Sequence, residues 1–497
     1  MSAGRAAALE MADGERLWFA AENLRLVQQL FPGAHIVPEV RLPSGLDGAA
    51  DENTAPIALL RGHVESLGPV TAGELAQRTA LRPTTVVSGL AQLEGDGTVL
   101  RGRFRRGLDE EEFCDRRLLA RIHRYTLDRL RSEIEPVSAQ DFLRFLLRWQ
   151  HVAPGTQLEG KRGVLEAVTQ LQGFELPAVA WERHVLPARV AGYRASWLDE
   201  LCLSGDVAWA RLSLPKSGNN SASSHAAASS ATQISLSRRS DVLWLMAGIR
   251  NGGSPDAPAR GAAHDVLELL ERRGALFHDD IVAGSRRLPA DVERGLWELV
   301  ARGLVTSDGF QALRSLMVNG RRRPSRGSAR APRMRGLSSG VPAGRWALLP
   351  AEVEPLESDE LAERWAEQFL FRYGVVFRDM AQRESMSVPW REVLRALRRM
   401  EARGVVRGGR FVGGFYGEQY ARPEAVESLR RVRRTDKHGE EVLVNAVDPL
   451  NLAGILTPGP RIPAVHTKVV LHRDGVPSAV PDDARAIAAQ RRAATGA

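Results

Sequence analysis

The residues with the clearest chemistry are arginines that stand in two short runs containing glycine. The runs are Arg101-Gly-Arg103-Phe-Arg105-Arg106 and Arg407-Gly-Gly-Arg410-Phe411. A guanidinium group presents several N–H donors to a phosphate, and neighbouring glycines let the backbone approach the same anion. These runs therefore predict contacts to a polyanion such as DNA, with an affinity that does not depend on base sequence.

A further group of arginines lies on a segment whose spacing predicts a helix from about Pro389 to Arg403. Its apolar residues fall on one side, and the opposite side carries Arg391, Arg395, Arg399 and Arg403. A solvated charged face, which many helices have, explains this pattern as well as a binding surface does. The adjacent arginine run favours binding. The related helix near residue 291 carries Asp291 and Glu293 instead, which predicts a spacer or docking module.

The charge of the whole chain agrees with a polyanionic partner. The formal net charge is +8, and only four residues are lysine, so nearly all the positive charge is arginine. A GC-rich genome explains the choice of arginine over lysine equally well. It does not explain where the arginines stand.

A repeated pattern indicates the elements that must hold these residues. A Leu, then Leu or Met three positions on, then Gly and Val, occurs four times, with the glycines at Gly97, Gly205, Gly303 and Gly404. The first two positions are one helical turn apart, the glycine ends the helix, and the valine begins a strand. Each copy therefore predicts a helix that runs into a β-hairpin.

Three copies share upstream landmarks as well. Gly68, Gly274 and Gly374 precede the signature glycine by 29 or 30 residues, and the interval holds a short predicted helix and a second helix that opens near a proline. Proline suits the first turn of a helix because its missing N–H has no partner there. Helix, turn, helix and hairpin make a winged helix. Chance repetition of common residues is the alternative, and the fixed spacing argues against it.

Composition excludes several classes of protein. A length of 497 residues with 43% hydrophobic content predicts roughly three to four globular domains. No apolar run approaches the ~18 residues of a membrane span, so the predicted location is the cytoplasm, associated with the nucleoid. Cys114 and Cys202 are the only cysteines, and the histidines are scattered, so we predict no disulfide framework, metal site or cofactor.

The fold class predicted is α+β, with tandem winged-helix domains and a small C-terminal β module. We expect a helix over about residues 109 to 135 within the second region. The predicted divisions are an N-terminal helical segment (1–56), winged helix 1 (57–108), a helical or winged-helix region 2 (109–212), a low-complexity linker (213–238), winged helix 3 (239–319), a basic linker (320–340), winged helix 4 (341–435), and the β module with its tail (436–497).

Longer motifs resemble a known family, the bacterial large helicase-related proteins (Lhr), over about residues 15 to 480. The motifs are Asp141-Phe-Leu-Arg-Phe-Leu-Leu-Arg-Trp149-Gln-His151, Tyr193-Arg-x-x-Trp197-Leu-Asp-Glu-Leu-Cys-Leu-Ser-Gly205, Gly344-Arg-Trp346, Gly409-Arg-Phe-Val-Gly-Gly-Phe415-x-Gly-Glu-Gln419 and Asp448-Pro-Leu-Asn-Leu452. The resemblance is to the C-terminal region. It implies a tandem winged-helix array that ends in a β-barrel-like module, follows an ATP-dependent helicase motor in the full-length family protein, and serves DNA repair.

The motor itself is not expected in this chain. No Gly-x-x-x-x-Gly-Lys-Ser/Thr phosphate loop occurs, and the only Gly-Lys pair, Gly160-Lys161, is followed by Arg. We therefore predict neither ATP hydrolysis nor duplex unwinding by this chain alone.

The family's array is also similar to winged-helix DNA glycosylases, which implies uracil-type chemistry on a flipped base. Such chemistry needs a rigidly aimed carboxylate. Asp448, in an Asp-Pro turn, is the first catalytic candidate and Asp474 the second, although Asp is also a favoured turn residue. Gln170 and Gln172 have the Gln-x-Gln spacing of those glycosylases but fall where a helix ends, so they rank lower.

Three functions stay open: a DNA-binding array, a uracil-type DNA glycosylase, and a winged-helix scaffold for protein assembly. The DNA-binding residues predicted are Arg101, Arg103, Arg105, Arg391, Arg395, Arg399, Arg407 and Arg410. The expected partner is single-stranded or duplex DNA. RNA, a separate helicase motor subunit and a second copy of the chain are further partners to test, and no membrane partner is expected.

Overall fold

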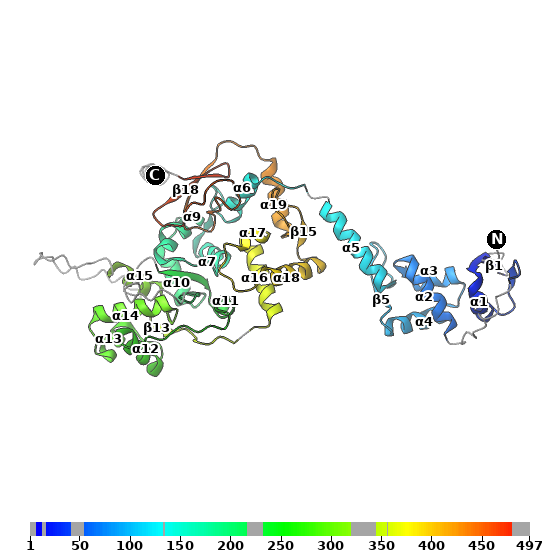
Figure 1. The fold of residues 1–497 in the computed structure, drawn as a ribbon, viewed down its shortest axis with the longest axis horizontal. Coiled ribbons are helices and arrows are strands. Elements are labelled where there is room, and N and C mark those ends of the chain that lie inside the picture. The colour runs from blue at the N-terminus through cyan, green and yellow to red at the C-terminus, as the bar shows by residue number, and fades with distance from the viewer. Residues whose placement is uncertain are drawn as a thin grey trace, which may run out of the picture. The chain divides into compact units, whose positions relative to one another are not determined.

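The computed structural model describes residues 6–11, 16–40, 54–132, 135–215, 232–319, 344–354 and 356–479. The chain forms two compact units, Met1–Leu130 and Arg131–Ala497, which are considered separately (Figure 1). Within the described ranges no helix is both long enough and apolar enough to cross a membrane.

The N-terminal segment contains a small antiparallel sheet, and the prediction of a helical segment over 1–56 was wrong. Strands β1 (Ala6–Glu10), β2 (Arg16–Ala20) and β3 (His35–Val37) pair in the order β2-β1-β3, and a 3-10 turn η1 (Ala21–Asn23) leads into the short helix α1 (Leu24–Leu30). The alanine-rich β1 is the central strand and is largely buried. Pairing on both of its edges overrides the helical preference of alanine.

The first winged helix follows in the same unit. Its elements are α2 (Ala55–Leu67), β4 (Val70–Thr71), α3 (Ala72–Thr79), α4 (Pro83–Gly95), β5 (Val99–Gly102) and β6 (Glu112–Asp115), with the sheet order β4-β6-β5. Thr71 and Glu74 form a capping box that starts α3. The signature residues Leu90, Leu93 and Val99 are buried. Helix α5 (Arg116–Ser132) begins after residue 109, because β6 first takes Glu112–Asp115 into the sheet.

The second region opens the larger unit. Its helical elements are α6 (Ala139–Trp149), α7 (Gly160–Leu171), α8 (Ala178–Ala180), the π-helical turn η2 (Trp181–Val185), α9 (Leu186–Arg189) and α10 (Ala195–Leu203). Its strands are β7 (Leu158–Glu159), β8 (Leu176–Pro177), β9 (Val190–Ala191), β10 (Val207–Ala210) and β11 (Gln233–Arg238). β11 pairs with β10 and β8, so the end of the predicted linker 213–238 is a strand. Residues 216–231 of that linker lie outside the described residues.

The third module contains η4 (Arg239–Asp241), α11 (Val242–Arg250), α12 (Ala262–Arg273), α13 (His278–Ser285), α14 (Pro289–Arg302), β12 (Val305–Ser307), α15 (Phe310–Asn319) and β13 (Trp346–Leu348). β13 pairs with β12, so residues Trp346–Leu348, which the predicted division places in the fourth module, complete the third module's sheet. The predicted basic linker, 320–340, lies outside the described residues.

The fourth module repeats the plan of the first. It consists of α16 (Ser358–Tyr373), β14 (Val375–Val376), α17 (Arg378–Ala381), α18 (Trp390–Ala402), β15 (Arg407–Gly409), β16 (Gln419–Ala421) and α19 (Pro423–Arg434). The sheet order β14-β16-β15 matches β4-β6-β5. Tandem winged helices of the α+β class are therefore confirmed.

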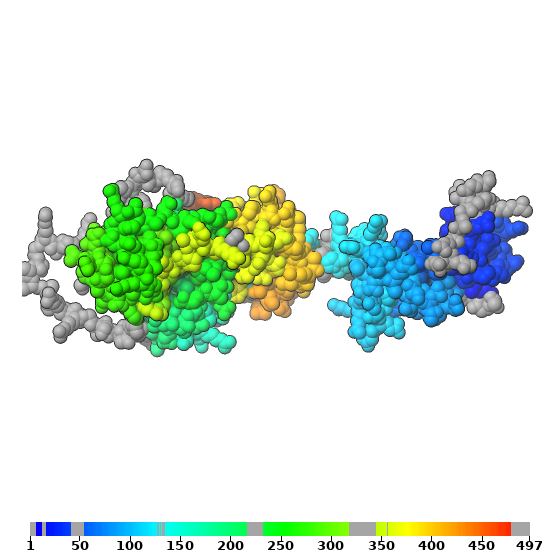
Figure 2. All heavy atoms as spheres, turned by 90° about the horizontal axis from the view of Figure 1, so that it is seen from below, coloured from blue at the N-terminus to red at the C-terminus, as the bar shows by residue number. Residues whose placement is uncertain are grey.

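The modules of the larger unit share hydrophobic cores, so they form one packed body (Figure 2). Phe142 and Phe145 of α6 pack in one core with Phe369 and Phe377 of the fourth module. A second core joins the second and third modules, where Trp209 meets Trp346 edge to face at a centroid distance of 5.9 Å.

The C-terminal strands β17 (Glu441–Asn445), β18 (Val469–Arg473) and β19 (Val476–Ala479) form an antiparallel sheet in sequence order. The predicted β module is present. Over the described residues up to 479 this sheet is open, and closure into a barrel-like form stays a prediction.

Candidate nucleic-acid interface

The wing of the first module is held in shape by one buried carboxylate. Glu112 on β6 pairs with Gly102 on β5, and its Oε2 accepts hydrogen bonds of 2.7 Å from the backbone N–H groups of Phe104 and Arg105. The Phe104 ring lies over Gly102, where an added Cβ would stand 2.9 Å from it. Burial raises the pKa of Glu112, but hydrogen bonds from Arg105 and Phe104 outweigh it and lower the pKa overall.

Two of the predicted binding arginines in this wing are engaged with carboxylates of the fold. Arg105 bonds to Glu112 and, through Nη1 and Nη2, to Glu74 at 3.0 and 2.8 Å. The side-chain bond from Arg105, followed by the backbone bond from Thr71, lowers the pKa of Glu74 to about 2. Arg101 is held by two further carboxylates, with its Nε 3.2 Å from Glu94 and its Nη1 3.3 Å from Glu111.

The neighbouring Arg103 differs from Arg101 and Arg105. It is exposed, and the described residues offer its guanidinium group neither an ion pair nor a hydrogen bond. Arg106 is exposed in the same way. The wing therefore presents cations at its free edge while its other arginines stabilise the hairpin.

The wing of the fourth module has the same strand register, but a neutral side chain takes the place of Glu112. We call the residue at this position, which accepts the backbone N–H groups of the turn, the clasp of the wing. Gln419 pairs with Gly409, as Glu112 pairs with Gly102. Its Oε1 accepts the backbone N–H groups of Phe411 and Val412 at 2.9 and 2.8 Å, and its Nε2 donates to the Val412 carbonyl at 2.9 Å. Because the strands pair residue for residue in the same way, Arg410 is the counterpart of Arg103.

Arg407 and Arg410 are both exposed, and no side-chain partner is found for either among the residues that the structure describes. The hairpin tip adds an aromatic ring. Phe415 packs inward against Phe377 at a centroid distance of 4.7 Å, while the next residue, Tyr416, is 88% exposed. Gly414 and Gly417 flank it with positive φ values of 88° and 91°, which favour glycine. Sequence reasoning missed Tyr416, although an aromatic residue between turn glycines was a usable signal.

The basic face of α18 is largely neutralised by neighbouring carboxylates. Arg391 and Arg395 share Glu392 on their own helix at 3.1 and 2.8 Å. Arg399 lies 3.2 Å from Asp359, and Arg403 bonds to Glu363, both on α16. These pairs are solvent-exposed, and exposed pairs contribute little and exchange readily. The geometry fits a solvated charged face, while DNA contact by Arg391, Arg395 and Arg399 stays a prediction.

Asp448 lies in the larger unit inside a buried ion pair. Its Oδ2 and Oδ1 accept from the Nη1 and Nη2 of Arg189 at 2.6 and 2.8 Å, and Oδ1 also accepts the Leu450 N–H at 3.0 Å. Asp448 and Arg189 are 1% and 0% exposed. This is the geometry of a turn residue that anchors the C-terminal module.

Asp474 is also engaged by the backbone. Its Oδ2 accepts the Gly439 N–H at 2.8 Å and its Oδ1 the Glu440 N–H at 3.0 Å. Of the two glutamines, Gln172 is fully used by Asp241, Gln368 and the Arg238 N–H. Gln170 lines a pocket considered below. Within the described residues no cluster of three or more His, Cys, Asp or Glu side chains could hold a metal ion.

Comparisons with known proteins agree with this architecture. Residues 137–236 and 355–441 each match a family model described as "Large helicase-related protein, winged-helix domain". "Lhr helicase/ probable uracil glycosylase" of Mycolicibacterium smegmatis is 29% identical over 463 residues, which cover 89% of this chain and 29% of that protein. "Lhr helicase/uracil glycosylase" of Escherichia coli is 29% identical over 498 residues, covering 89% of this chain and 31% of that protein.

The chain thus spans about three-tenths of the length of these two relatives. A solved structure, the DNA glycosylase AlkZ of Streptomyces sahachiroi, is similar with a TM-score of 0.38 and 15% identity over 69% of this chain and 87% of that one. The resemblance to the C-terminal region of the large helicase-related proteins, indicated by the sequence motifs, is confirmed.

Proposed function

We propose that this chain, which resembles the C-terminal region of the large helicase-related proteins, is a DNA-binding array of winged-helix domains. The observation that carries the proposal is the pair Arg103 and Arg410. These arginines occupy equivalent positions on two wings, are exposed, and have no carboxylate partner among the described residues. The relatives' names, which include a helicase and a uracil glycosylase, favour DNA as the polyanion.

Within this proposal the wing arginines have two roles. Arg103, Arg407 and Arg410 contact phosphates directly, because a guanidinium group without an internal partner keeps all its donors available. Arg101 and Arg105 hold the first wing in position through their carboxylates. We propose also that a separate motor subunit, RNA and a second copy of the chain are further partners, and that the protein works at the nucleoid.

The experiment is a titration of labelled single-stranded and duplex oligonucleotides by fluorescence anisotropy, repeated from about 50 to 200 mM salt. We expect binding of both ligands, with the logarithm of the association constant falling linearly with the logarithm of salt concentration. A chain that binds neither ligand at the lowest salt would contradict the proposal and favour a protein-assembly scaffold.

A second candidate function is uracil-DNA glycosylase activity, which the names of both relatives favour. The test is incubation with an oligonucleotide containing one uracil, followed by alkaline cleavage of abasic sites. Single-stranded substrate should react better, because extruding a paired base costs a few kcal/mol. If abasic sites form in neither substrate, the glycosylase proposal is wrong and only the DNA-binding proposal is left.

Asp448 and Asp474 stay the candidate catalytic residues, and their variants need a stability measurement beside the activity assay. Asp448→Asn leaves Arg189 buried and without its ionic partner, which costs about 3–5 kcal/mol. A loss of activity therefore supports catalysis only if the variant is still folded and still binds DNA. Asp474→Asn is the milder test, because Asp474 accepts two backbone N–H groups rather than a buried guanidinium group.

A further inference from the structure

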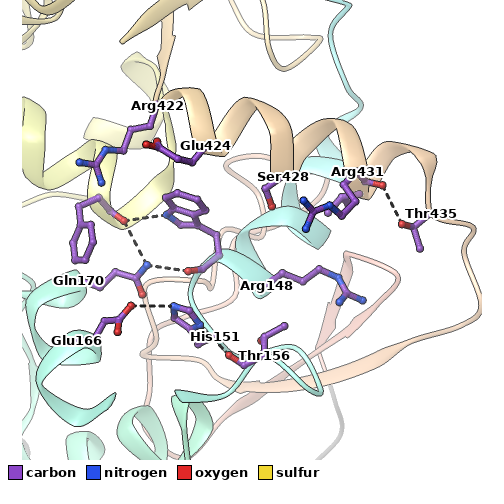
Figure 3. Close-up of a pocket in the computed structure, with 13 residues that line it drawn as sticks. Arg148, His151, Thr156, Glu166, Gln170, Arg422, Glu424, Ser428, Arg431 and Thr435 are labelled. Atoms are coloured by element: carbon purple, nitrogen blue, oxygen red, sulfur yellow. Dashed lines mark hydrogen bonds and ion pairs between the residues drawn. The ribbon is translucent and has the colours of Figure 1, made fainter. Parts of the chain in front are cut away.

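The larger unit contains a pocket of about 640 Å³ whose chemistry the wings do not explain. It lies between the end of α6, α7, the end of α16 and one face of α19 (Figure 3). Glu424, Ser428, Arg431 and Thr435 are spaced by four, three and four residues, so they project from the same face of α19 toward the pocket. The volume is in the range of small-molecule sites.

One buried acceptor at this pocket has no partner. Gln170 on α7 is 4% exposed, and its Nε2 donates to the backbone carbonyls of Trp149 at 2.9 Å and Phe371 at 3.4 Å. These two bonds fix the orientation of the amide, so its Oε1 must be an acceptor. Among the described residues this oxygen accepts nothing. A buried acceptor without a donor is unfavourable and calls for a partner from outside the protein.

A second acceptor, the carboxylate of Glu166, lies on the same helix and also lines the pocket. The Nδ1 of His151 is 2.9 Å from the carbonyl of Thr156, so Nδ1 carries a proton and donates to that carbonyl, while the other ring nitrogen, Nε2, faces Glu166. That Nε2 lies 4.0 Å from the carboxylate of Glu166 (Figure 3). The α7 side of the pocket is therefore rich in acceptors and suits a ligand that presents N–H or O–H donors.

The α19 side carries cations. Arg422, the residue before α19, lies over the ring of Phe371 at 5.9 Å, and Arg431 is exposed near the other end of the helix. Neither guanidinium group has a carboxylate partner in the part of the chain that the structure describes. Arg148 differs, because Glu440 holds it at 3.0 and 3.1 Å. Two arginines are thus available to an anion.

We propose that this pocket binds a single nucleotide of a bound DNA strand, either an extruded one or one at a strand end. The edge of the base donates to the acceptors on α7, the aromatic side chains Trp149 and Phe371 border its ring, and Arg422 and Arg431 hold the phosphate. A nucleotide unites the three features that the lining demands: hydrogen-bond donors, a planar ring and an anion. The inference rests on the proposed function and names the place where the array handles one residue of its ligand.

The test is photo-crosslinking of the full chain, with mass-spectrometric mapping of the attached peptides. One probe is a single-stranded oligonucleotide with one 4-thiothymine, and the other is the free 4-thiothymidine monophosphate. We expect the strand to crosslink within residues 148–156 or 422–431. Crosslinking only by the free nucleotide would overturn the strand assignment in favour of a mononucleotide site, and no crosslink there from either probe would overturn the site.

Matched variants on different faces of α19 make the test specific. Arg431→Gln should reduce crosslinking at the pocket about tenfold, the effect of losing a charge-assisted hydrogen bond. Arg430→Gln makes the same charge change on the face that lines a different pocket and should leave the yield unchanged. Equal losses in the two variants would show a general charge effect and contradict the assignment.

A steric variant separates the pocket from the wings. Ser428→Phe fills the pocket from a half-buried position, while Glu427→Phe places the same ring on an exposed neighbour. We expect Ser428→Phe to abolish the pocket crosslink and to retain salt-dependent strand binding. If the strand binds but Ser428→Phe crosslinks like the parent chain, the assignment of the pocket is wrong and the proposed DNA-binding function is unaffected. If the parent chain binds no strand at all, the proposed function fails with it.

Discussion

The first and fourth modules carry wings with the same register but a different clasp. In each wing the residue opposite a glycine accepts two backbone N–H groups of the turn, and this residue is Glu112 in the first and Gln419 in the fourth. Glu112 also binds Arg105, whereas Gln419 returns a hydrogen bond to the chain at Val412. The first wing is thus held by charge and the fourth by a neutral amide.

The difference shows which arginines a wing can offer to a ligand. The charged Glu112 binds an arginine of its own wing, so the side chain of Arg105 is engaged within the first module. The equivalent residue of the fourth wing is Val412. The exposed Arg103 and Arg410 are common to both wings. An arginine run therefore identifies a wing, but the carboxylates around it decide which of its side chains are available.

The largest expected effect comes from breaking the neutral clasp. Gln419→Leu leaves the N–H groups of Phe411 and Val412 without an acceptor, and each unsatisfied buried group costs about 1–3 kcal/mol. We expect a clear loss of unfolding free energy in urea and faster amide exchange over residues 406–421. Gln419→Glu, which restores the acceptor found in the first wing, should lose less. Equal stability of Gln419→Leu and the parent chain would contradict this role.

The tips of the wings should differ in binding to single strands. The connecting stretch has the same length in both wings, and it places Asp109 where the fourth wing has Tyr416. A base stacked on an aromatic side chain contributes about 1–3 kcal/mol, so Tyr416→Ala should weaken single-strand affinity about tenfold. Tyr416→Phe should bind like the parent chain. An unchanged affinity of Tyr416→Ala would remove the fourth tip from the interface.

Acid should destabilise the first wing, which charged groups hold, more than the fourth. Of the three expected effects on the wings, this is the smallest. Arg105 and then Thr71 lower the pKa of Glu74 to about 2 in the folded chain, below its ordinary value of 4.5. The unfolded state therefore binds more protons between these values, and the stabilisation present above pH 4.5 is lost as the pH falls toward 2. Melting temperatures measured across this range should fall less steeply for Glu74→Gln. Parallel curves would show that the Glu74 pair does not stabilise the fold.

The repeated elements could be predicted from the sequence because they depend on local rules. The signature Leu, Gly and Val residues mark a buried helix face, a turn and a strand, and Leu397, Met400 and Val406 are buried as expected. The N-terminal sheet could not be predicted in this way. Its alanine-rich β1 favours a helix by propensity, and only pairing with β2 and β3, which depends on distant residues, decides otherwise.

The site was predictable in residue type but not in detail. Arg101 and Arg103 look alike in sequence, and only the positions of Glu94 and Glu111 after folding distinguish them. The same holds for Asp448, because Arg189 stands far from it in the sequence and meets it in the core. The pocket at Gln170 depends on four elements that no local pattern brings together.

The most direct test of the central claim, that arginines free of carboxylates bind phosphate, is the salt dependence of DNA affinity in two matched double variants. Arg103→Gln with Arg410→Gln removes the exposed pair, and Arg101→Gln with Arg398→Gln removes two arginines held by carboxylates. Both variants lower the charge equally. We predict that the first flattens the slope of log affinity against log salt by up to ~1.8 on duplex DNA, about 0.9 for each lost contact, and that the second changes it much less. Equal flattening in both variants, or none in the first, would contradict the account.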